Sequence, residues 1–351
     1  MTKVLIATKP DDMHAIYAKL ALNKNGLAAD LWYTADFPTK SAYSFEIARN
    51  KFLWQTDEGI CPIHDNDYHT IWYRRPAKPV LPDYIHPDDV SNAKKENLMF
   101  FQNMWQAIYP NAIWINPVSS AARSNSKILQ LKIADKAHLN IPETLISNNP
   151  LAIKDFIKKN NAIYKPLYPV AWVDKNEMRL TYTKSISVEN LPSDKLLQCT
   201  PGIFQQKIEK QYELRITYFG NKYIAVKIHS QIHDQAKMDW RSAPVEELLL
   251  EQVVLPDKID LACKETMKNL GIVFGCFDFI VTPENEYYFL EVNEQGQFLW
   301  IEGVNPDIKM LQAFTEFVSN KTVTISMSDL REEAERFMSF AMKNHINPPQ
   351  F

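Results

Sequence analysis

The sequence predicts a mixed α/β fold divided into several lobes, and three observations lead to this prediction. The chain begins with a short apolar strand at Lys3–Thr8, a helix, and a second strand at Ala29–Tyr33, which is the start of an open α/β sheet. Near the other end, residues 277–281 and 287–293 are rich in aromatic and β-branched residues and flank a turn, as in a β-hairpin. A chain of 351 residues is also too long for one small core, so two or three lobes are expected.

The composition is that of an ordinary globular protein, with 46% hydrophobic and 23% charged residues. The formal net charge of −3 argues against nucleic acid and against an anionic membrane surface as partners. The four cysteines form no Cys-x-x-Cys pair, which argues against a zinc site or a disulfide framework. The N-terminal apolar run is too short for a signal peptide, and no stretch approaches about 20 apolar residues, so a cytoplasmic location is expected.

The first lobe is expected to be a βαβ unit with further strands. Asp11 or Asp12 can cap its first helix. No Gly-x-Gly-x-x-Gly follows the first strand, which argues against dinucleotide binding there. A strand at 68–73 runs into a basic turn, where Arg74 and Arg75 are either a solvated pair or part of a cleft. The remaining elements expected in this lobe are a helix and a strand, at 98–105 and 112–116.

Two lysines stand out in the second lobe. Ser124–Ser126 precede apolar residues at helical spacing, so Lys127 is expected in the first turn of a helix, where the helix end and its ammonium group would both favour phosphate. On pattern alone, a plain helix-surface lysine is the simpler interpretation. Lys165 ends a predicted strand at 162–165, directly before Pro166, which restricts its backbone.

The third lobe begins with a strand at 202–209 that crosses from the second lobe. Glu213 and Arg215 lie on one face of the next strand, where a salt bridge is the simple interpretation. After a polar loop, Asp239 and Arg241 form an Asp-x-Arg pair. A guanidinium group can hold a carboxylate or a phosphate by two parallel hydrogen bonds, which lysine cannot do.

The hairpin brings oxygen ligands together. If it is centred on Glu284–Asn285, Asp278 lies opposite Glu291, and Asn293 shares the face of Glu291. Two carboxylates so close would repel each other if unpaired, so a cation is the natural partner. Oxygen ligands of this kind suit Mg²⁺, with substrate phosphates in the remaining positions. An ordinary hairpin with exposed acids is the alternative.

The end of the chain is expected to hold a helix at 305–317, a short strand at 322–325 and a final amphipathic helix that starts near Ser328. This last helix packs either on the body of the chain or on a second subunit. The sequence leaves this choice, and therefore a homodimer, open.

The run from Glu291 to Glu302, Glu-Val-Asn-Glu-Gln-Gly-Gln-Phe-Leu-Trp-Ile-Glu, resembles the metal-binding end of ATP-grasp ligases. Its Asn-x-x-Gly-Gln-x-x-Trp-Ile-Glu part is similar, more narrowly, to the ATP-grasp peptide maturases that make microviridin-type cross-linked peptides, the graspetides. Trp-Tyr-Arg-Arg-Pro at 72–76 and Asp-x-Arg at 239–241 agree with this family. The resemblance covers residues 110–320 and, more loosely, the segment before them.

The resemblance implies an ATP-grasp fold with an N-terminal Rossmann-like lobe. The implied parts are an N-terminal pre-ATP-grasp domain, a central lid domain, a C-terminal ATP-grasp domain and a C-terminal helix, at 1–116, 117–200, 201–325 and 326–351. Many ATP-grasp proteins close the lid with a glycine-rich flap, but residues 168–176 contain no glycine. The resemblance therefore does not imply how this lid closes.

The resemblance also implies ATP and Mg²⁺ as cofactors. The implied ATP ligands are the side chains of Lys127 and Lys165 for the phosphates, the side chain of Glu213 for the ribose, and the backbone of Gln206, Lys207 and Ile208 for the adenine edge. The implied Mg²⁺ ligands are Asp278, Glu291 and Asn293. The implied catalytic residues are Arg215, which faces the phosphates, and Arg241, which holds the substrate carboxyl group and is oriented by Asp239.

Three functions fit these features. The first is an ATP-dependent ligase that activates Asp or Glu side chains of a ribosomal precursor peptide, with a leader and a core, and closes rings with Thr or Ser hydroxyls or Lys amines. The second is a ligase that joins a free amino acid to a peptide or protein, like glutathione synthetase. The third is a peptide-binding module with a dead nucleotide site, against which the intact set of lysines, arginine and acids argues.

Overall fold

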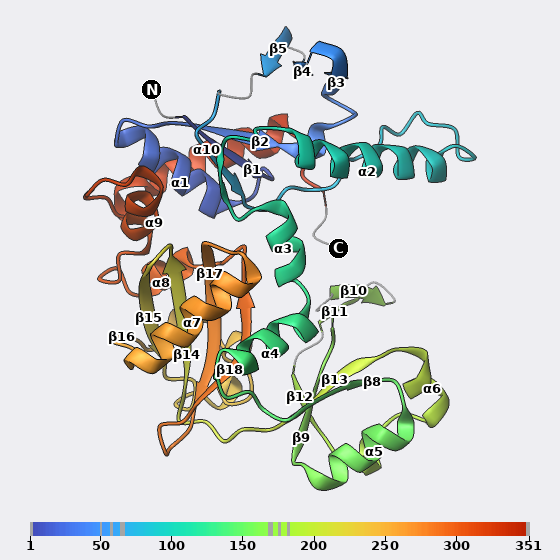
Figure 1. Cartoon of the computed structure of the whole chain (residues 1–351), viewed down its shortest axis with the longest axis vertical. Helices are drawn as coiled ribbons and strands as arrows, with labels where there is room; N and C mark the ends of the chain where they lie inside the picture. The colour runs from blue at the N-terminus through green and yellow to red at the C-terminus, as the bar shows by residue number, and fades with distance from the viewer. Residues whose placement is uncertain are drawn as a thin grey trace. The chain divides into compact units, whose positions relative to one another are not determined.

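The structure is a computed structural model that describes residues 3–49, 51–56, 59–63, 67–167, 171–174, 177–180 and 183–348 (Figure 1). The predicted mixed α/β class is confirmed by helices and strands that alternate along the chain. The chain divides into two compact units: unit 1 contains the residues up to 121 and those from 297 onward, and unit 2 contains residues 122–296. Unit 1 therefore takes in 297–325, which the sequence analysis assigned to the third lobe. The four-part division by function stays a prediction.

Unit 1 is built on a parallel four-stranded sheet, and its predicted strand–helix–strand start is confirmed. Asp12 caps α1 by accepting a hydrogen bond from the backbone N–H of His14. The strand order is β2-β1-β6-β7, with bounds Ala28–Tyr33, Lys3–Thr8, Thr70–Tyr73 and Ile113–Ile115. The helices are α1 (Met13–Lys24), α2 (Val90–Ala107), α8 (Leu299–Val304), α9 (Met310–Ser319) and α10 (Arg331–Asn344).

Unit 1 also contains a small antiparallel sheet that the sequence analysis did not predict. Its strands are β3 (Ala42–Glu46), β4 (Lys51–Thr56) and β5 (Gly59–Ile63), in that order. Tyr43 and Phe52 of this sheet join the aromatic core of unit 1, where Trp32 donates a hydrogen bond to the Tyr43 hydroxyl at 2.9 Å. This extra sheet therefore shares the core of the parallel sheet.

The C-terminal part of unit 1 lacks one predicted element, and it contains a helix, α8, that was not predicted. Residues 322–325 form no strand, and the backbone N–H of Val323 instead donates to Glu316 at 3.3 Å. The final helix is present as α10 and packs on α1, where Lys24 and Glu333 lie 3.9 Å apart. This contact places one face of α10 on the chain itself, and a homodimer stays a prediction.

Arg74, in the basic turn after β6, is not exposed to solvent. The interpretation of Arg74 and Arg75 as a solvated pair is therefore wrong for Arg74. The Arg74 side chain is fully buried and its Nε donates to Asp12 Oδ2 at 3.1 Å. Thr8 donates a second hydrogen bond to the same carboxylate oxygen at 2.8 Å. Although burial alone would raise it, the charge of Arg74 holds the pKa of Asp12 below its usual value. This ion pair joins the start of α1 to the end of β6 inside unit 1.

We expect Asp12→Asn to lower the free energy of unfolding by about 3–5 kcal/mol, because it removes the carboxylate that pairs with the fully buried Arg74 side chain. The wild-type contribution of Asp12 is present above the unfolded pKa of about 3.9 and is lost as the pH falls through its lower folded pKa. Denaturant unfolding at several pH values measures both effects. The control is Glu46→Gln, which removes an exposed pair with Arg49 and should cost less than about 1 kcal/mol. Equal losses in the two variants would contradict this prediction.

Unit 2 contains two sheets and a separate hairpin. The first sheet has the order β12-β9-β13-β8, with bounds Lys184–Ile186, Ala162–Lys165, Gly202–Gln206 and Thr144–Ser147. Helices α5 (Pro150–Lys159) and α6 (Asp194–Cys199) supply buried side chains to its core. Strands β10 (Ala171–Asp174) and β11 (Glu177–Leu180) form the hairpin. Residues 168–170, 175 and 176, which belong to the predicted lid segment, lie outside the described residues.

The second sheet of unit 2 is antiparallel and carries most of the predicted site. Its order is β16-β15-β14-β17-β18, with bounds Leu250–Val253, Lys222–Ile228, Tyr212–Phe219, Phe274–Val281 and Tyr287–Asn293. Helices α4 (Lys127–Lys136) and α7 (Asp257–Leu270) share a core with the sheet and with each other (Figure 1). A further helix, α3 (Val118–Ser124), spans the boundary between the units.

The hairpin β17–β18 confirms that Asp278 lies opposite Glu291, but the register next to its turn differs by one residue from the predicted register. Near the turn, Val281 pairs with Tyr287 and Phe279 with Phe289, whereas beyond Asp278 the register changes by one residue. This irregularity in the ladder restores the predicted pairing. Asp278 and Glu291 therefore face each other because of the β-bulge.

Within the described part of the chain, we find no helix whose length and apolar character would let it cross a membrane.

Candidate active site

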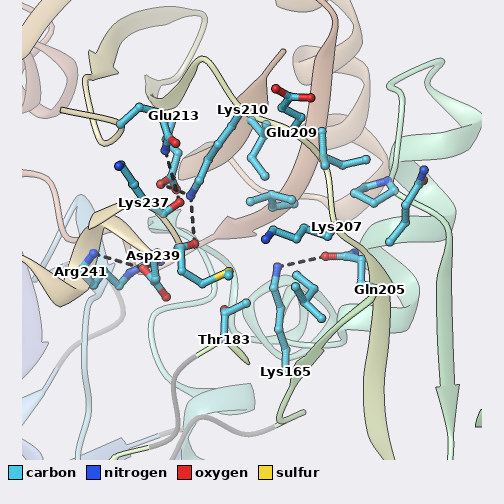
Figure 2. Close-up of a pocket in the computed structure, with 18 of the residues that line it drawn as sticks. Lys165, Thr183, Gln205, Lys207, Glu209, Lys210, Glu213, Lys237, Asp239 and Arg241 are labelled. Carbon is cyan, nitrogen blue, oxygen red and sulfur yellow. Dashed lines mark hydrogen bonds and ion pairs between the residues drawn. The ribbon is translucent and has the colours of Figure 1, made fainter. Parts of the chain in front are cut away.

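A cavity of about 560 Å³ in unit 2 brings together side chains from both sheets (Figure 2). One wall comes from the end of β9 and from β13 with the segment after it, and the opposite wall from β14 and from the loop that precedes β16. Seven of the predicted site residues line it: Lys165, Gln206, Lys207, Ile208, Glu213, Asp239 and Arg241. The cavity therefore collects seven predicted residues that are up to 76 positions apart in the sequence.

The segment at 206–208 was predicted to bind the adenine edge through its backbone. It has fewer backbone N–H groups available as hydrogen-bond donors than expected. The backbone N–H of Gln206 donates to Glu143 at 2.8 Å, and that of Lys207 donates to Asn161 at 2.7 Å. The backbone N–H of Ile208 donates no hydrogen bond within the described residues. Of the three backbone N–H groups that were predicted to bind the adenine edge, that of Ile208 therefore stays available in the described part of the chain.

Lys165 is held by a chain of hydrogen bonds that the sequence analysis missed. Its ammonium group donates to Gln205 at 3.0 Å, and the Gln205 amide donates to the Thr144 hydroxyl at 2.9 Å. The Thr144 hydroxyl in turn donates to the carbonyl of Pro142 at 2.7 Å. Burial lowers the pKa of Lys165, with Glu291 and Asp239 opposing that effect. Gln205 thus fixes where this amine points in the cavity.

Glu213 and Arg215 do not form the salt bridge that their shared face suggested. Glu213 pairs with Lys210 at 2.7 Å, and Arg215 pairs with Asp278 at 2.7 Å across the ladder between β14 and β17. Burial raises the pKa of Glu213, while Lys210 opposes that effect. The two residues therefore serve different parts of the site.

The facing acids of the hairpin are paired with cations of the chain. Asp278 accepts from Arg215 and, at 2.9 Å, from Nη2 of Arg241. Glu291 is hydrogen-bonded to Lys127 and lies 3.8 Å from Arg241. Although burial alone would raise it, Lys127 and Arg241 hold the pKa of Glu291 well below its usual value. Because Arg241 also lines the cavity, the acids adjoin the cavity at this guanidinium group.

The donor set fits Mg²⁺ in its chemistry, because it consists of two carboxylates and one amide oxygen. Among the described residues, no three His, Cys, Asp or Glu side chains gather where they could hold a metal, so Asn293 would have to supply the third ligand. The Asn293 oxygen accepts from the backbone N–H groups of Gln295 and Gly296, at 3.1 and 3.0 Å. Metal binding would therefore exchange hydrogen bonds and ion pairs within the chain for bonds to the ion.

The turn after Asn293 depends on Gly296. Its φ of +46° is in the left-handed region, which other residues seldom adopt. An added Cβ would also lie 2.8 Å from the sulfur of Cys276 and 2.9 Å from the ring of Phe274. The glycine of the family motif thus allows the backbone to turn directly after the predicted metal ligand.

Gln130 is another residue that the sequence analysis missed. Its buried amide donates to the carbonyl of Val292 at 2.9 Å and accepts from the N–H of Val292 at 2.9 Å. Val292 lies between Glu291 and Asn293, and Gln130 lies one turn after Lys127 in α4. The amide therefore fixes Lys127 relative to the edge strand that carries two predicted metal ligands. The signal available in the sequence was a glutamine among the apolar residues of this predicted helix.

Asp239 contacts Arg241 through both its backbone and its side chain. Its carboxylate accepts from the backbone N–H of Arg241 at 3.2 Å and from the guanidinium group at 3.3 Å. The guanidinium group also lies over the ring of Trp240, 4.9 Å from its centre. These contacts confine a side chain that is otherwise exposed, and they direct it to the acids of the hairpin.

The part of the family motif at 298–302 makes structural hydrogen bonds within unit 1. The backbone N–H groups of Phe298 and Leu299 donate to Nε2 of His14 at 3.0 and 3.1 Å. The buried carboxylate of Glu302 accepts from the backbone N–H of Leu311 at 2.8 Å and from that of Met327 at 2.7 Å. These residues hold the C-terminal segment to α1 and to α9.

Solved structures of ATP-grasp ligases are similar to this chain. A RiPP-associated ATP-grasp ligase of Chryseobacterium gregarium, in complex with ADP and a leader and core peptide, is 27% identical; the match covers 92% of this chain and 100% of that one, with a TM-score of 0.82. The macrocyclase MdnC of Microcystis aeruginosa MRC, bound with precursor peptide MdnA, is 28% identical, with 92% and 100% covered and a TM-score of 0.79. The macrocyclase MdnB of the same organism is 25% identical, with 91% and 99% covered and a TM-score of 0.73.

No protein-family model and no curated protein matches the chain. The likeness to the three solved ligases extends over more than nine tenths of this chain. It confirms the ATP-grasp fold and the resemblance to the graspetide-type ATP-grasp maturases that the motifs indicated.

Proposed function

We propose that this chain, an ATP-grasp protein of the graspetide-maturase type, is an ATP-dependent ligase that closes rings in a ribosomal precursor peptide. The observation that carries the proposal is the cavity in unit 2, where Lys165, Glu213 and Arg241 converge beside the paired acids Asp278 and Glu291. The similar ligases in complex with ADP or with precursor peptides support it.

The first step activates a side-chain carboxylate of the peptide. A carboxylate oxygen of an Asp or Glu side chain forms a bond to the terminal phosphorus of ATP, and the bond between that phosphorus and the bridging oxygen breaks, so ADP leaves. The product is an acyl phosphate on the peptide. Arg241 holds the incoming carboxylate and the developing charge with parallel hydrogen bonds, and Asp239 keeps the guanidinium group in place.

The second step closes the ring. A Thr or Ser hydroxyl, or a Lys amine, of the same peptide attacks the carbonyl carbon, loses a proton and displaces inorganic phosphate, which leaves an ester or an amide. Cys199, Cys263 and Cys276, the cysteines whose side chains the structure describes, do not line the cavity. No nucleophile of the chain is needed, and the chain acts by positioning and by charge.

The nucleotide would lie in the cavity with its phosphates near Lys165, Lys127 and Arg215. The ribose hydroxyls would donate to Glu213, and the adenine edge would accept from the N–H of Ile208. Asp278, Glu291 and Asn293 would hold Mg²⁺, which neutralises phosphate charge when it is bound. The leader part of the precursor would be a binding partner rather than the reacting group.

The experiment that tests the function combines the chain, ATP and Mg²⁺ with a candidate precursor peptide, a short peptide rich in Thr, Ser, Asp and Glu. We expect each ring to lower the peptide mass by one water and to consume one ATP. Hydrolysis with mild base separates the two chemistries, because esters are cleaved and amides persist. A peptide that instead gains phosphate or an amino acid would reject ring closure, and the latter would favour the glutathione-synthetase-like alternative.

Lys127→Ala and Lys165→Ala are expected to weaken ADP binding by about tenfold or more, because each removes a charged partner of phosphate oxygens. Peptide binding should change little in either variant. Titrating ADP and peptide separately against each protein decides this, with Lys136→Ala as the control, since Lys136 is an exposed lysine of the same helix. A loss of peptide affinity with unchanged ADP affinity would place these lysines in a different site.

A further inference from the structure

Lys210 joins two parts of the cavity wall through one ammonium group. Its Nζ donates to Oε1 of Glu213 at 2.7 Å and to the backbone carbonyl of Met238 at 2.9 Å (Figure 2). The side chains of Lys210 and Glu213 are each only 9% exposed, so this is an ion pair largely withdrawn from water. Lys210 therefore links two segments of the cavity wall and is not an exposed surface lysine.

The two acceptors of Lys210 belong to two segments with different expected roles in the proposed reaction site. Glu213 lies on β14, where the ribose is expected. Met238 directly precedes Asp239, which binds the guanidinium group of Arg241 at 3.3 Å. A single side chain thus links the expected ribose acceptor to the loop that presents the arginine for the substrate carboxylate.

We propose that Lys210 is a positioning residue that holds Glu213 as the acceptor of the ribose hydroxyls and fixes the loop of Asp239 and Arg241. The inference rests on the proposed function, because it takes the cavity as the nucleotide site. It adds a coupling between the two ends of the site: the same ammonium group sets where the nucleotide and the substrate clamp lie.

The electrostatics of the pair agree with this role. Burial raises the pKa of Glu213, and Lys210 is the strongest influence that opposes the rise. Without Lys210, the buried carboxyl group would take up a proton more readily and would lose acceptor capacity. Lys237 offers a contrast within the same wall, because it is exposed and pairs with Asp234 at 2.6 Å rather than with Glu213.

The binding test compares ADP with 2′-deoxy-ADP, in the presence of Mg²⁺, by calorimetry on the full chain. Wild type should prefer ADP. Lys210→Met should weaken ADP binding about tenfold to a hundredfold, as expected for the loss of a charged partner, and should remove most of the preference for ADP. Lys210→Gln, which keeps a hydrogen-bond donor but not the charge, is the second variant. It should also lose most of the preference for ADP over 2′-deoxy-ADP. Lys222→Met, the control for loss of a positive charge, should keep it, because Lys222 is an exposed lysine of β15 that does not line the cavity.

A double-mutant cycle separates positioning from general damage to the fold. In the Glu213→Gln background, Lys210→Met should cost much less in ADP affinity than in the wild type, because the partner is already gone. Lys210→Arg, which keeps the charge and can still donate to both acceptors, should recover most of the affinity. In ring closure, Lys210→Met should lower kcat as well as raise KM for ATP, because the Met238 contact is also lost.

The outcomes are distinguishable. A wild-type chain that binds ADP while Lys210→Met and Lys210→Gln keep the full preference for ADP would overturn the role of Lys210 alone. Additive losses in the cycle with Glu213 would do the same. A wild-type chain that binds no ADP would overturn the proposed function and this inference together.

Discussion

The Glu291→Gln variant is expected to release ADP at least about a hundredfold more slowly than the wild type, because it loses a charged ligand that a bound metal would need. The substitution keeps the shape of the side chain and its place opposite Asp278 on β17. The fold should persist, since the Glu291 side chain is 32% exposed and its main partner, Lys127, can be solvated.

Measuring ADP binding with and without Mg²⁺ tests this prediction further, because Glu291 and Lys127 are paired in the chain. In the wild type, Mg²⁺ should strengthen ADP binding by replacing Lys127 as the partner of Glu291 and freeing its ammonium group for phosphate. In Glu291→Gln the ammonium group is already free, so ADP binding without Mg²⁺ should be retained or strengthened. The additional affinity that Mg²⁺ gives should then disappear.

The matched control for Glu291→Gln is Glu284→Gln, the same substitution at the exposed turn of the same hairpin. It should bind ADP and respond to Mg²⁺ like the wild type. Normal turnover in Glu291→Gln, or an unchanged response to Mg²⁺, would show that Glu291 is not a metal ligand. A lower unfolding midpoint in Glu291→Gln alone would indicate damage to the fold instead.

The sequence was sufficient to predict which residues lie near each other on one element, because strand and helix periods are fixed. Glu291 and Asn293 lie two positions apart on β18 for this reason, and Lys127 begins its helix where the polar cap predicts. The pairing of Asp278 with Glu291 was right although the predicted register next to the turn was not. A one-residue bulge changed the register at the position that mattered.

The partners of these residues could not be predicted, because they come from segments that only the fold brings together. Arg215 pairs with Asp278 rather than with Glu213 because β14 lies beside β17. Gln130 reaches Val292 across 162 positions of sequence. The sequence indicates at most that a buried amide or ammonium group needs a partner, and not which partner it finds. The contacts that fix the site are therefore long-range, whereas the motifs are local.

The largest effect on catalysis is expected from Arg241→Lys, which should lower kcat for ring closure by about a hundredfold or more. A side-chain carboxylate must approach the terminal phosphate of ATP although both are negative. Two unit charges about 4 Å apart repel by roughly 4 kcal/mol at an effective dielectric constant near 20. Arg241 is placed to offset this repulsion, because its guanidinium group lies 2.9 Å from Asp278 and 3.3 Å from Asp239.

Lysine would keep the charge of Arg241 but not its planar fork. One ammonium group cannot bind Asp239 and Asp278 and also offer two parallel hydrogen bonds to a carboxylate. The stacking on Trp240, at 4.9 Å, would also be lost. ADP affinity should therefore fall little while kcat falls strongly, and Asp239→Asn should show a weaker loss of the same kind. The control is Arg123→Lys, an exposed arginine of unit 2 that donates only to the carbonyl of Asn269 among the described contacts. If Arg241→Lys kept more than about half of the wild-type kcat, charge alone would suffice at this position, and the fork of Arg241 would have no part in holding the substrate carboxylate.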